Sequence, residues 1–271
     1  MKKKIVLMLT VIMLIGLAGC GKNQINIKET GTSDNNEQMV QNIYENKRTE
    51  VKQKISEIKE RLPETSAEDK GTCGSKAKWY YKDNTLIIYG EGVITEDTWH
   101  KSNIVINTVV IDSGITKLGN NMFSGLGSEV GKNIENFYIA DGLEEIGSST
   151  FVNCDCLSEI VLPPSLYFID GYTFASCDSL KNVYMTDGVE KIGDSAFTGC
   201  KSLDSIFIPK TVLAIGNGVF TGCNNLSDIQ ISKDNRIFSE KNNCIINNDT
   251  KTLIYAINKD FSIPDDILCI A

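Results

Sequence analysis

The feature that most constrains this fold is a repeat with a period of 23 residues. It runs through four consecutive segments without insertion or deletion: 138–160, 161–183, 184–206 and 207–229. Within the segments, an isoleucine, a phenylalanine and a leucine stand at fixed positions: Ile146, Ile169, Ile192 and Ile215; Phe151, Phe174, Phe197 and Phe220; Leu157, Leu180, Leu203 and Leu226. A unit this short cannot bury its apolar side alone, whereas stacked units bury it continuously. The period therefore predicts a solenoid.

Each repeat is also predicted to contain a β-strand with the pattern L-x-x-I-x-L. Leu157, Ile160 and Leu162 follow this pattern, which turns all three toward the interior and leaves the intervening residues outside. Neighbouring strands of a sheet lie about 4.8 Å apart, so each residue lies above its copy in the next coil. The phenylalanines are therefore expected to form a ladder in the core of a β-rich solenoid with parallel strands.

The repeated motif I-G-x-x-x-F-x-x-C-x-x-L-x-x-I closely resembles that of the BspA-like leucine-rich repeats of bacterial surface proteins. The period of 23 residues also lies within the 20–29 residues of leucine-rich repeats. Gly71-Thr72-Cys73-Gly74 and Trp99 resemble the cap that often precedes such repeats, so that the resemblance covers about 200 of the 271 residues. It implies a leucine-rich-repeat solenoid, a cell-surface location and a role in adhesion or recognition, but it names no ligand.

Segments with other patterns flank the repeats. Residues 71–103 are predicted to form a β-hairpin cap, because alternating apolar residues lie on both sides of the turn Lys82-Asp83-Asn84. The leucine-rich repeats are expected to run over residues 104–233. Residues 234–261 are predicted to form an inserted β-hairpin, and residues 262–271 restart the repeat as a truncated copy.

The N-terminus resembles that of a bacterial lipoprotein. Residues 1–19 combine a run of lysines with an apolar segment shorter than the roughly 20 residues of a membrane-spanning helix, as a signal peptide does. The segment Leu17-Ala18-Gly19-Cys20 resembles a lipobox. We therefore expect Cys20 to carry acyl chains that anchor the protein to the extracytoplasmic face of a cell membrane. Residues 20–36 are polar and are expected to form a tether.

Residues 37–63 are predicted to form an amphipathic helix that ends at Pro63. Its apolar stripe, which Arg48 interrupts, consists of five residues: Tyr44, Val51, Ile55, Ile58 and Leu62. One interpretation is a stalk helix that lifts the solenoid off the membrane. The alternative is a short coiled coil, which would give weak self-association through residues 37–62.

Charge and residue content disfavour several function classes. Removal of residues 1–19 takes away three lysines, which leaves 24 basic and 35 acidic side chains and a formal charge of −11. This acidic balance disfavours nucleic acid and anionic lipid as partners. His100 is the single histidine, and neither a phosphate-binding glycine loop nor the motif H-E-x-x-H is present. We therefore predict a protein without enzyme activity, metal site or cofactor.

Four cysteines share one position of the repeat: Cys154, Cys177, Cys200 and Cys223. We interpret them as small buried apolar residues. Disulfides between adjacent coils are the alternative, although parallel stacking points the Cβ atoms of neighbouring coils in the same direction.

The candidate ligand-binding surface is a stripe on the outer face of the predicted strands. The residue that follows each inward residue points outward, and stacking aligns four of them in one column: Tyr138, Val161, Tyr184 and Phe207. Polar neighbours are expected to form its rim: Asn136, Glu159, Asn182 and Ser205. Aromatic residues are enriched at binding hot spots, so the stripe predicts recognition of a partner. Alternatively, the rings only support one another across the strands.

The sequence thus favours a membrane-anchored surface protein that binds or adheres to an extracellular protein or glycan through its solenoid. The alternative is a structural stalk-and-spacer lipoprotein, or a truncated remnant of a larger adhesin, without a specific ligand. A pull-down with host matrix or bacterial surface proteins separates these two functions.

Overall fold

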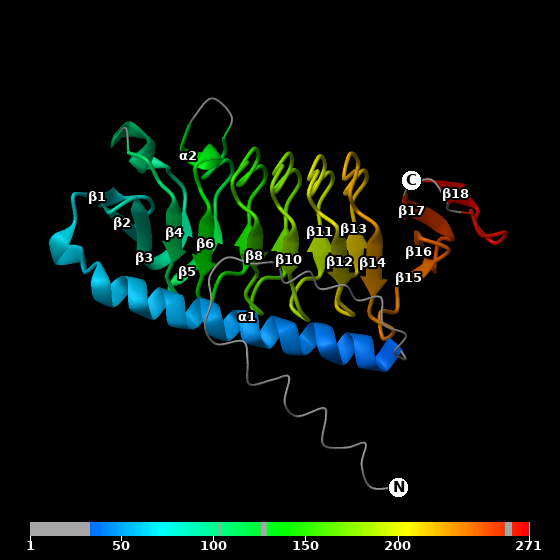
Figure 1. Ribbon diagram of the computed structural model, residues 1–271. Coiled ribbons are helices and arrows are strands. Elements are labelled where there is room, and N and C mark those ends of the chain that lie inside the picture. The colour runs from blue at the N-terminus through cyan, green and yellow to red at the C-terminus, as the bar shows by residue number, and fades with distance from the viewer. Residues whose placement is uncertain (1–32, 103, 126–128, 258–261, 271) are drawn as a thin grey trace, which may run out of the picture. The chain divides into compact units, whose positions relative to one another are not determined.

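Parallel strands stack in register from coil to coil, so the repeats form a solenoid (Figure 1). The computed structural model describes residues 33–102, 104–125, 129–257 and 262–270. The predicted signal peptide, Cys20 and residues 20–32 of the predicted tether lie outside the described residues. Among the helices that are described, none is both long and apolar enough to cross a membrane. The predicted β-rich solenoid of parallel strands is confirmed.

The coils contribute strands of three or four residues to a front column and, after β5, strands of two residues to a back column. The front strands are β4 (Thr108–Ile111), β6 (Asn136–Ile139), β8 (Glu159–Val161), β10 (Asn182–Tyr184), β12 (Ser205–Ile208) and β14 (Asp228–Ile231). The back strands are β5 (Ile115–Leu118), β7 (Glu145–Ile146), β9 (Phe168–Ile169), β11 (Lys191–Ile192) and β13 (Ala214–Ile215). Equivalent residues pair between neighbouring coils, as Ile160 pairs with Val183 in front and Ile169 with Ile192 behind. Each inward side chain therefore lies above its copy.

An antiparallel β-meander closes the N-terminal end of the coils. Its strands are β1 (Asp69–Thr72), β2 (Lys76–Lys82) and β3 (Thr85–Ile94). Asp83 and Asn84 join β2 to β3 with positive φ angles of 48° and 56°, which the tight hairpin turn requires. β3 then pairs in parallel with both β4 and β5, so it begins both columns. Three short helices complete the structure: η1 (Glu64–Ser66) precedes β1, η2 (Thr98–Ser102) lies between β3 and β4, and α2 (Glu129–Lys132) lies between β5 and β6.

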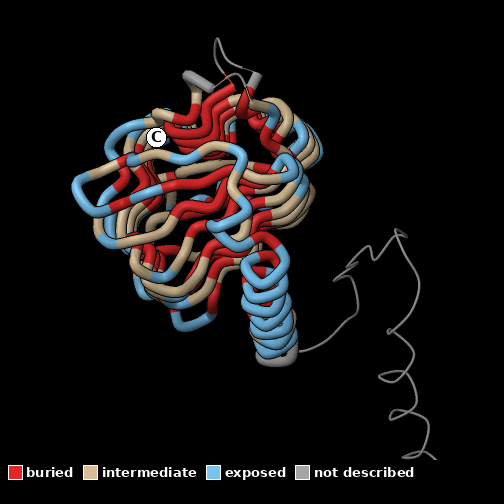
Figure 2. The backbone as a smooth tube through the Cα atoms, turned by 90° about the vertical axis from the view of Figure 1, so that its left-hand side faces the viewer, coloured by how far each residue is buried: buried red, intermediate tan, exposed pale blue. Residues whose placement is uncertain are grey.

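The core is built around the predicted ladder of phenylalanine rings. The rings of four successive coils are fully buried, with centroids of neighbouring rings 5.0 to 5.8 Å apart: Phe151, Phe174, Phe197 and Phe220. Trp99 of the cap extends the stack through Phe123, at a centroid distance of 5.4 Å. At the other end, Tyr255 turns its edge toward Phe220. Viewed along the coils, the buried residues lie inside them (Figure 2).

The C-terminal segment contains one more strand than the predicted hairpin at 234–261. Three antiparallel strands follow one another there: β15 (Phe238–Lys241), β16 (Cys244–Asn247) and β17 (Thr252–Ala256). The extra strand forms because Phe238 is buried in the main core, as is Ile245. The truncated repeat supplies β18 (Cys269–Ile270), which pairs in parallel with β17 and leaves Leu268 and Ile270 exposed.

The repeated cysteines are free thiols that hydrogen-bond from coil to coil. Each Sγ donates to the carbonyl oxygen of the phenylalanine in the preceding coil at 3.0 to 3.2 Å: Cys154 to Phe123, Cys177 to Phe151, Cys200 to Phe174 and Cys223 to Phe197. Burial raises the pKa of Cys177 well above its ordinary value, so this thiol stays protonated. These cysteines therefore serve packing and hydrogen bonding.

Iodoacetamide is expected to modify only Cys156 and Cys269 of the eight described cysteines while the protein is folded. Both thiols are exposed, whereas the other six are buried, and alkylation requires an accessible thiolate. Peptide mass spectrometry after labelling with and without denaturant measures the difference. Rapid labelling of Cys177 or Cys200 in the native protein would contradict the buried thiol ladder.

Candidate binding surfaces

The stripe predicted from the sequence lies on the outer face of the front strands. Strand pairing places Tyr138 beside Val110, Val161 beside Tyr184, and Phe207 beside Gln230. Residues on either side of the stripe point into the core, where Phe137 and Ile139 are buried. The register aligns the outward residues within each pair of front strands, and β6 lies against β8 and β10 against β12, so that the pairs follow one another along the solenoid.

This stripe is not a free surface, because α1 (Ser33–Arg61) packs along the front strands (Figure 1). Helix and strand residues form one apolar cluster: Tyr44, Val51, Ile55, Ile58 and Leu62 with Tyr80, Ile87, Val110 and Val161. Tyr138 and Tyr184 pack against the same cluster, and Val161 is only 4% exposed. Phe207 is half-buried outside it. Three of the four stripe residues thus contact the chain's own helix.

The helix predicted as a stalk or coiled coil is therefore part of the solenoid's surface. It begins beside the C-terminal coils and ends beside the cap, with exposed residues on its outer side (Figures 1 and 2). Docked in this way, α1 does not lift the solenoid off a membrane, and its apolar stripe is not free to pair with a second copy. The reason is that helix and strands each carry an apolar stripe, and mutual burial removes both from water.

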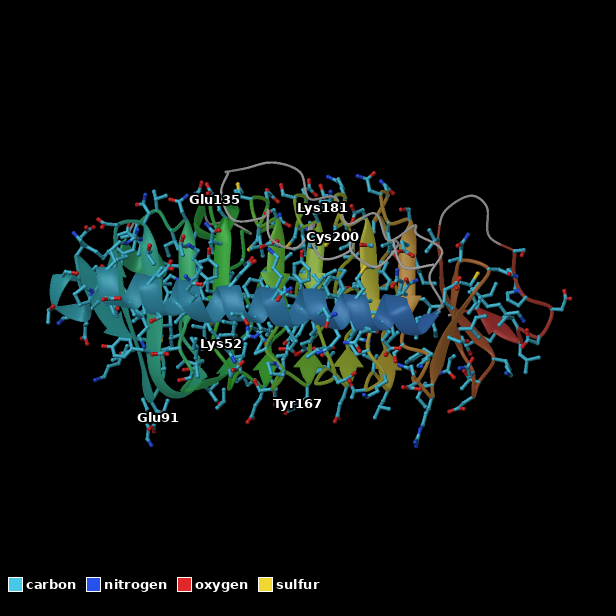
Figure 3. The ribbon with its side chains drawn as sticks, turned by 60° about the horizontal axis from the view of Figure 1, so that its bottom comes forward. Lys52, Glu91, Glu135, Tyr167, Lys181 and Cys200 are labelled. Carbon is cyan, nitrogen blue, oxygen red and sulfur yellow. The ribbon has the colours of Figure 1, made fainter. Side chains whose placement is uncertain are left out.

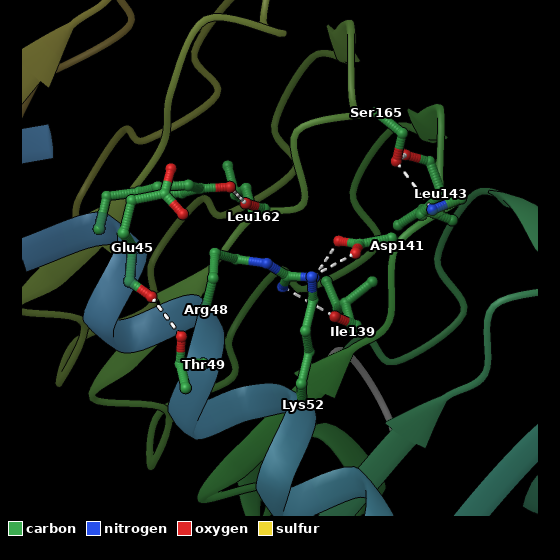
Figure 4. Close-up of polar contacts among 11 residues, drawn as sticks. Glu45, Arg48, Thr49, Lys52, Ile139, Asp141, Leu143, Leu162 and Ser165 are labelled. Carbon is green, nitrogen blue, oxygen red and sulfur yellow. Dashed lines mark hydrogen bonds and ion pairs between the residues drawn. The ribbon is translucent and has the colours of Figure 1, made fainter. Parts of the chain in front are cut away.

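Arg48, which interrupts the apolar stripe of the helix, is buried against the solenoid. Its guanidinium donates to the carbonyl oxygen of Ile139 at 2.9 Å and to the Asp141 carboxylate at 2.5 Å (Figure 4). The ammonium of Lys52 lies 2.7 Å from the same carboxylate. The aliphatic part of Arg48 can lie in an apolar cluster because its charged end reaches these polar partners.

Further polar contacts hold α1 at other coils. The Tyr44 hydroxyl donates to the carbonyl oxygen of Leu162 at 2.8 Å. Nearer the cap, the Lys59 ammonium lies 2.5 Å from the Asp112 carboxylate. These contacts fix the position of the helix along the strands, which an apolar stripe alone does not specify.

The predicted rim residues lie at the first positions of their strands. Glu159 accepts hydrogen bonds from the Lys47 ammonium at 3.0 and 3.2 Å, so one rim residue is engaged by α1. Asn136, Asn182 and Ser205 are half-buried. The rim is therefore partly used by the helix as well.

Docking of α1 is expected to weaken in acid because of Asp141. Burial works to raise the pKa of this carboxyl, but hydrogen bonds from Lys52 and Arg48 outweigh it and hold the pKa below the ordinary value. A carboxyl with a depressed pKa stabilises the folded state above its ordinary pKa of about 3.9, and this stabilisation is lost as pH falls through the lower, folded value.

Urea unfolding of the wild type and of Asp141→Asn, measured between pH 3 and pH 7, tests this expectation. We expect the wild type to be more stable at neutral pH and the difference to shrink below about pH 4. A difference that stays constant across the range would mean that the Asp141 carboxylate does not stabilise the docked helix.

The back of the solenoid carries the aromatic surface that remains open. We call residues 161–183 the aromatic coil, because Tyr167, Phe168 and Tyr172 point outward from it. Tyr167 is 40% exposed and Tyr172 is 51% exposed, while Phe168 is half-buried beneath the Lys191 ammonium, 4.9 Å from the ring centroid. Figure 3 places Tyr167 on the opposite side of α1 from Lys181.

Neighbouring coils place other residue types at the positions of the aromatic coil. The position of Tyr167 holds Glu144 and Glu190 in the adjacent coils. The Tyr167 hydroxyl donates to the Glu145 carboxylate, and this hydrogen bond raises the pKa of the phenol. Tyr172 has a φ of 57°, which is uncommon for a bulky side chain. Aligning the repeats and marking outward positions with unusual residues would have identified this coil from the sequence.

The side chains that most often ligate metal ions are dispersed within the residues that the structure describes. Within the described parts of the chain, no three histidine, cysteine, aspartate or glutamate side chains converge on a common point. His100 lies in η2, before the first repeat strand, and its Nδ1 is 2.6 Å from the Asp97 carboxylate. The back of the solenoid presents exposed aromatic rings, a tyrosine hydroxyl bonded to a carboxylate and a lysine ammonium above a phenylalanine ring.

Comparison with known proteins agrees with this geometry. Residues 130–250 match the BspA type leucine rich repeat region in 6 copies. The repeats are BspA-type leucine-rich repeats. The strand register and the burial of each residue show which positions of the BspA-type repeats point outward and which point inward. No curated protein matches the chain significantly.

Two solved structures have a similar fold. A leucine-rich repeat protein from Eubacterium ventriosum superposes with a TM-score of 0.64 at 23% identity, covering 74% of this chain and 55% of that one. The pneumococcal vaccine antigen PcpA gives a TM-score of 0.55 at 17% identity, covering 76% of this chain and 61% of that one. The chain therefore spans 55 to 61% of the length of these two proteins.

Proposed function

We propose that this protein is a cell-surface binding or adhesion protein that recognises an extracellular protein or glycan through its BspA-type repeats. The observation that carries the proposal is the aromatic coil, where Tyr167 and Tyr172 leave large parts of their rings in water. Exposed aromatic rings supply much contact area at little cost in side-chain entropy and are enriched at binding hot spots. Stacked repeats suit this role because they present extended surfaces.

The accessible side of the solenoid differs from the one that the sequence suggested. Because α1 covers the stripe that contains Tyr138, Val161 and Tyr184, recognition by the back of the solenoid needs no rearrangement of the chain. The back also carries Leu213, which is 58% exposed two coils beyond Tyr167. The proposed role is binding without catalysis.

The proposal includes anchoring at the extracytoplasmic face of a membrane through lipid on Cys20. We expect Cys20→Ala to leave an unlipidated chain that moves from the detergent phase to the aqueous phase in Triton X-114 separation. The physical reason is that each buried CH₂ of an acyl chain contributes about 0.8 kcal/mol to membrane binding. Unchanged partitioning of the variant would show that Cys20 is not the anchor.

A spacer without a specific ligand is the alternative, and one experiment separates the two functions. The full chain is used as bait against host matrix proteins, bacterial surface proteins and a glycan array. We expect the double variant Tyr167→Ser, Tyr172→Ser to reduce capture of the bound partner at least about tenfold, since hot-spot residues each contribute more than about 1.4 kcal/mol.

The matched control replaces two exposed apolar residues at the N-terminal end of the solenoid, Val93 and Val105, by serine. This variant removes apolar surface outside the aromatic coil and should bind like the wild type. Equal capture by both double variants would overturn the role of the aromatic coil. Absence of any captured partner would favour the spacer.

A further inference from the structure

A cavity of about 360 Å³ lies between the C-terminal half of α1 and the front of the solenoid. The helix and three strands supply its polar lining: Lys54, Glu57, Arg61, Thr85, Thr108 and Tyr138. Its volume falls in the range of about 300–1,000 Å³ for small-ligand sites. We infer that this cavity binds a saccharide unit that carries a single carboxylate, such as a uronic or sialic acid. The site is separate from the aromatic coil.

The charges of the cavity select an anion. The Lys54 ammonium lies 3.2 Å from the Glu57 carboxylate, so these two charges compensate each other. Arg61 forms no ion pair or hydrogen bond with any residue in the described ranges, although it lines the same cavity. Its planar guanidinium offers two parallel N–H donors, which match the two oxygens of a carboxylate.

The same charges disfavour an anion with more than one charge. Hydrogen bonds from Gln53 and Lys54 lower the pKa of Glu57, which is therefore ionised at neutral pH and repels further negative charge. A phosphate ester carries about 1.5 to 2 negative charges at pH 7. One unpaired arginine beside an ionised glutamate therefore suits a carboxylate better than a phosphate.

The uncharged groups of the cavity suit a sugar ring. Thr85 and Thr108 lie opposite each other on β3 and β4. The Thr108 hydroxyl makes no side-chain hydrogen bond within the part of the chain that the structure describes. The half-buried ring of Tyr138 adds an apolar face that can pack on the C–H side of a sugar. A sugar acid combines hydroxyls, an apolar face and one carboxylate, whereas an aliphatic acid lacks the hydroxyls.

Titration of the full chain with small glycosides, followed by NMR, tests the inference. The probes are methyl glucuronide and methyl sialoside, with the neutral methyl glucoside and inorganic phosphate as comparisons. We expect at least one acidic glycoside to bind at least about tenfold more tightly than methyl glucoside, the difference that a hydrogen bond to a charged group provides. The preferred acid tells whether a uronate or a sialylated glycan is the natural source.

Arginine variants connect this binding to the cavity. Arg61→Gln should weaken binding of the acidic glycoside at least about tenfold. Arg236→Gln is the matched control, because it removes an exposed arginine remote in sequence from the cavity, and should leave binding unchanged. Thr108→Val should weaken binding, whereas Thr108→Ser, which keeps the hydroxyl, should retain it.

Equal binding of methyl glucoside or phosphate, equal losses in the two arginine variants, or no binding of either acid would overturn the inference. The Tyr167→Ser, Tyr172→Ser variant should bind the acidic glycoside like the wild type. Failure of this site therefore leaves the proposed role of the aromatic coil standing, and failure of the aromatic coil leaves this site standing.

Discussion

Phe197→Ala is expected to lower the free energy of unfolding by about 3–5 kcal/mol. The ring is fully buried and stacks between Phe174 and Phe220, with centroids 5.2 and 5.8 Å away. Because equivalent rings above and below are held by their own coils, the structure cannot collapse into the cavity that alanine leaves. Urea unfolding monitored by circular dichroism measures the loss, which is a large part of the total stability of about 5–15 kcal/mol of a typical domain.

Phe168→Ala serves as the matched control for this prediction. Phe168 is also a phenylalanine of a central coil, but it points outward and is half-buried. Its replacement should cost clearly less than that of Phe197, because less apolar surface returns to water. A loss below about 1 kcal/mol for Phe197→Ala would mean that its ring does not lie in a well-packed core.

Val51→Asp is expected to detach α1 from the solenoid while the coils stay folded. Val51 is 5% exposed in the apolar cluster between the helix and the front strands. The change removes about 1.5–3 kcal/mol of apolar burial and adds a carboxylate, whose desolvation is costly without a partner. A detached α1 is a long, lysine-rich helix, so limited trypsin digestion should cleave residues 33–61 rapidly and spare the repeats.

Asn46→Asp is the matched control, because it adds the same charge at an exposed position of the same helix. It should leave α1 as resistant to trypsin as in the wild type. Resistance of Val51→Asp as well would contradict packing of the helix on the stripe. Detachment also tests the further inference, since the cavity loses Lys54, Glu57 and Arg61 and should no longer bind an acidic glycoside.

The repeat by itself determined the solenoid. Leu157, Ile160 and Phe197 are buried as the spacing predicts. Prediction succeeds here because each coil packs on near-copies of itself: the partner of every inward side chain is the equivalent residue one period away. The repeat pattern in the sequence therefore also predicts which residues are in contact in the tertiary structure. The cysteine ladder follows in the same way, with thiols stacked at one repeat position.

The candidate surfaces depended on contacts that no local pattern specifies. The sequence identified an apolar stripe on residues 37–63 and another through Tyr138, Val161 and Tyr184, and each required some partner. Whether that partner is a second copy, a ligand or the chain itself depends on the path of the backbone between them. The role of the aromatic coil as an open surface could not be recognised from the sequence for a related reason. Tyr167 and Tyr172 differ from the residues at the same positions of other repeats, but their importance becomes evident only when the side covered by α1 is known.

The repeat period therefore determined the fold, and only the tertiary structure decided which surfaces remain open. Tyr44 and Leu162, joined by a hydrogen bond, are 118 residues apart in the sequence. Burial of apolar surface is non-directional, so a stripe specifies that it will be covered but not by what. Specific contacts make α1 the segment that covers the stripe. The helix is long enough to span the front strands, and its basic residues form ion pairs with aspartates that follow those strands: Arg48 and Lys52 with Asp141, and Lys59 with Asp112.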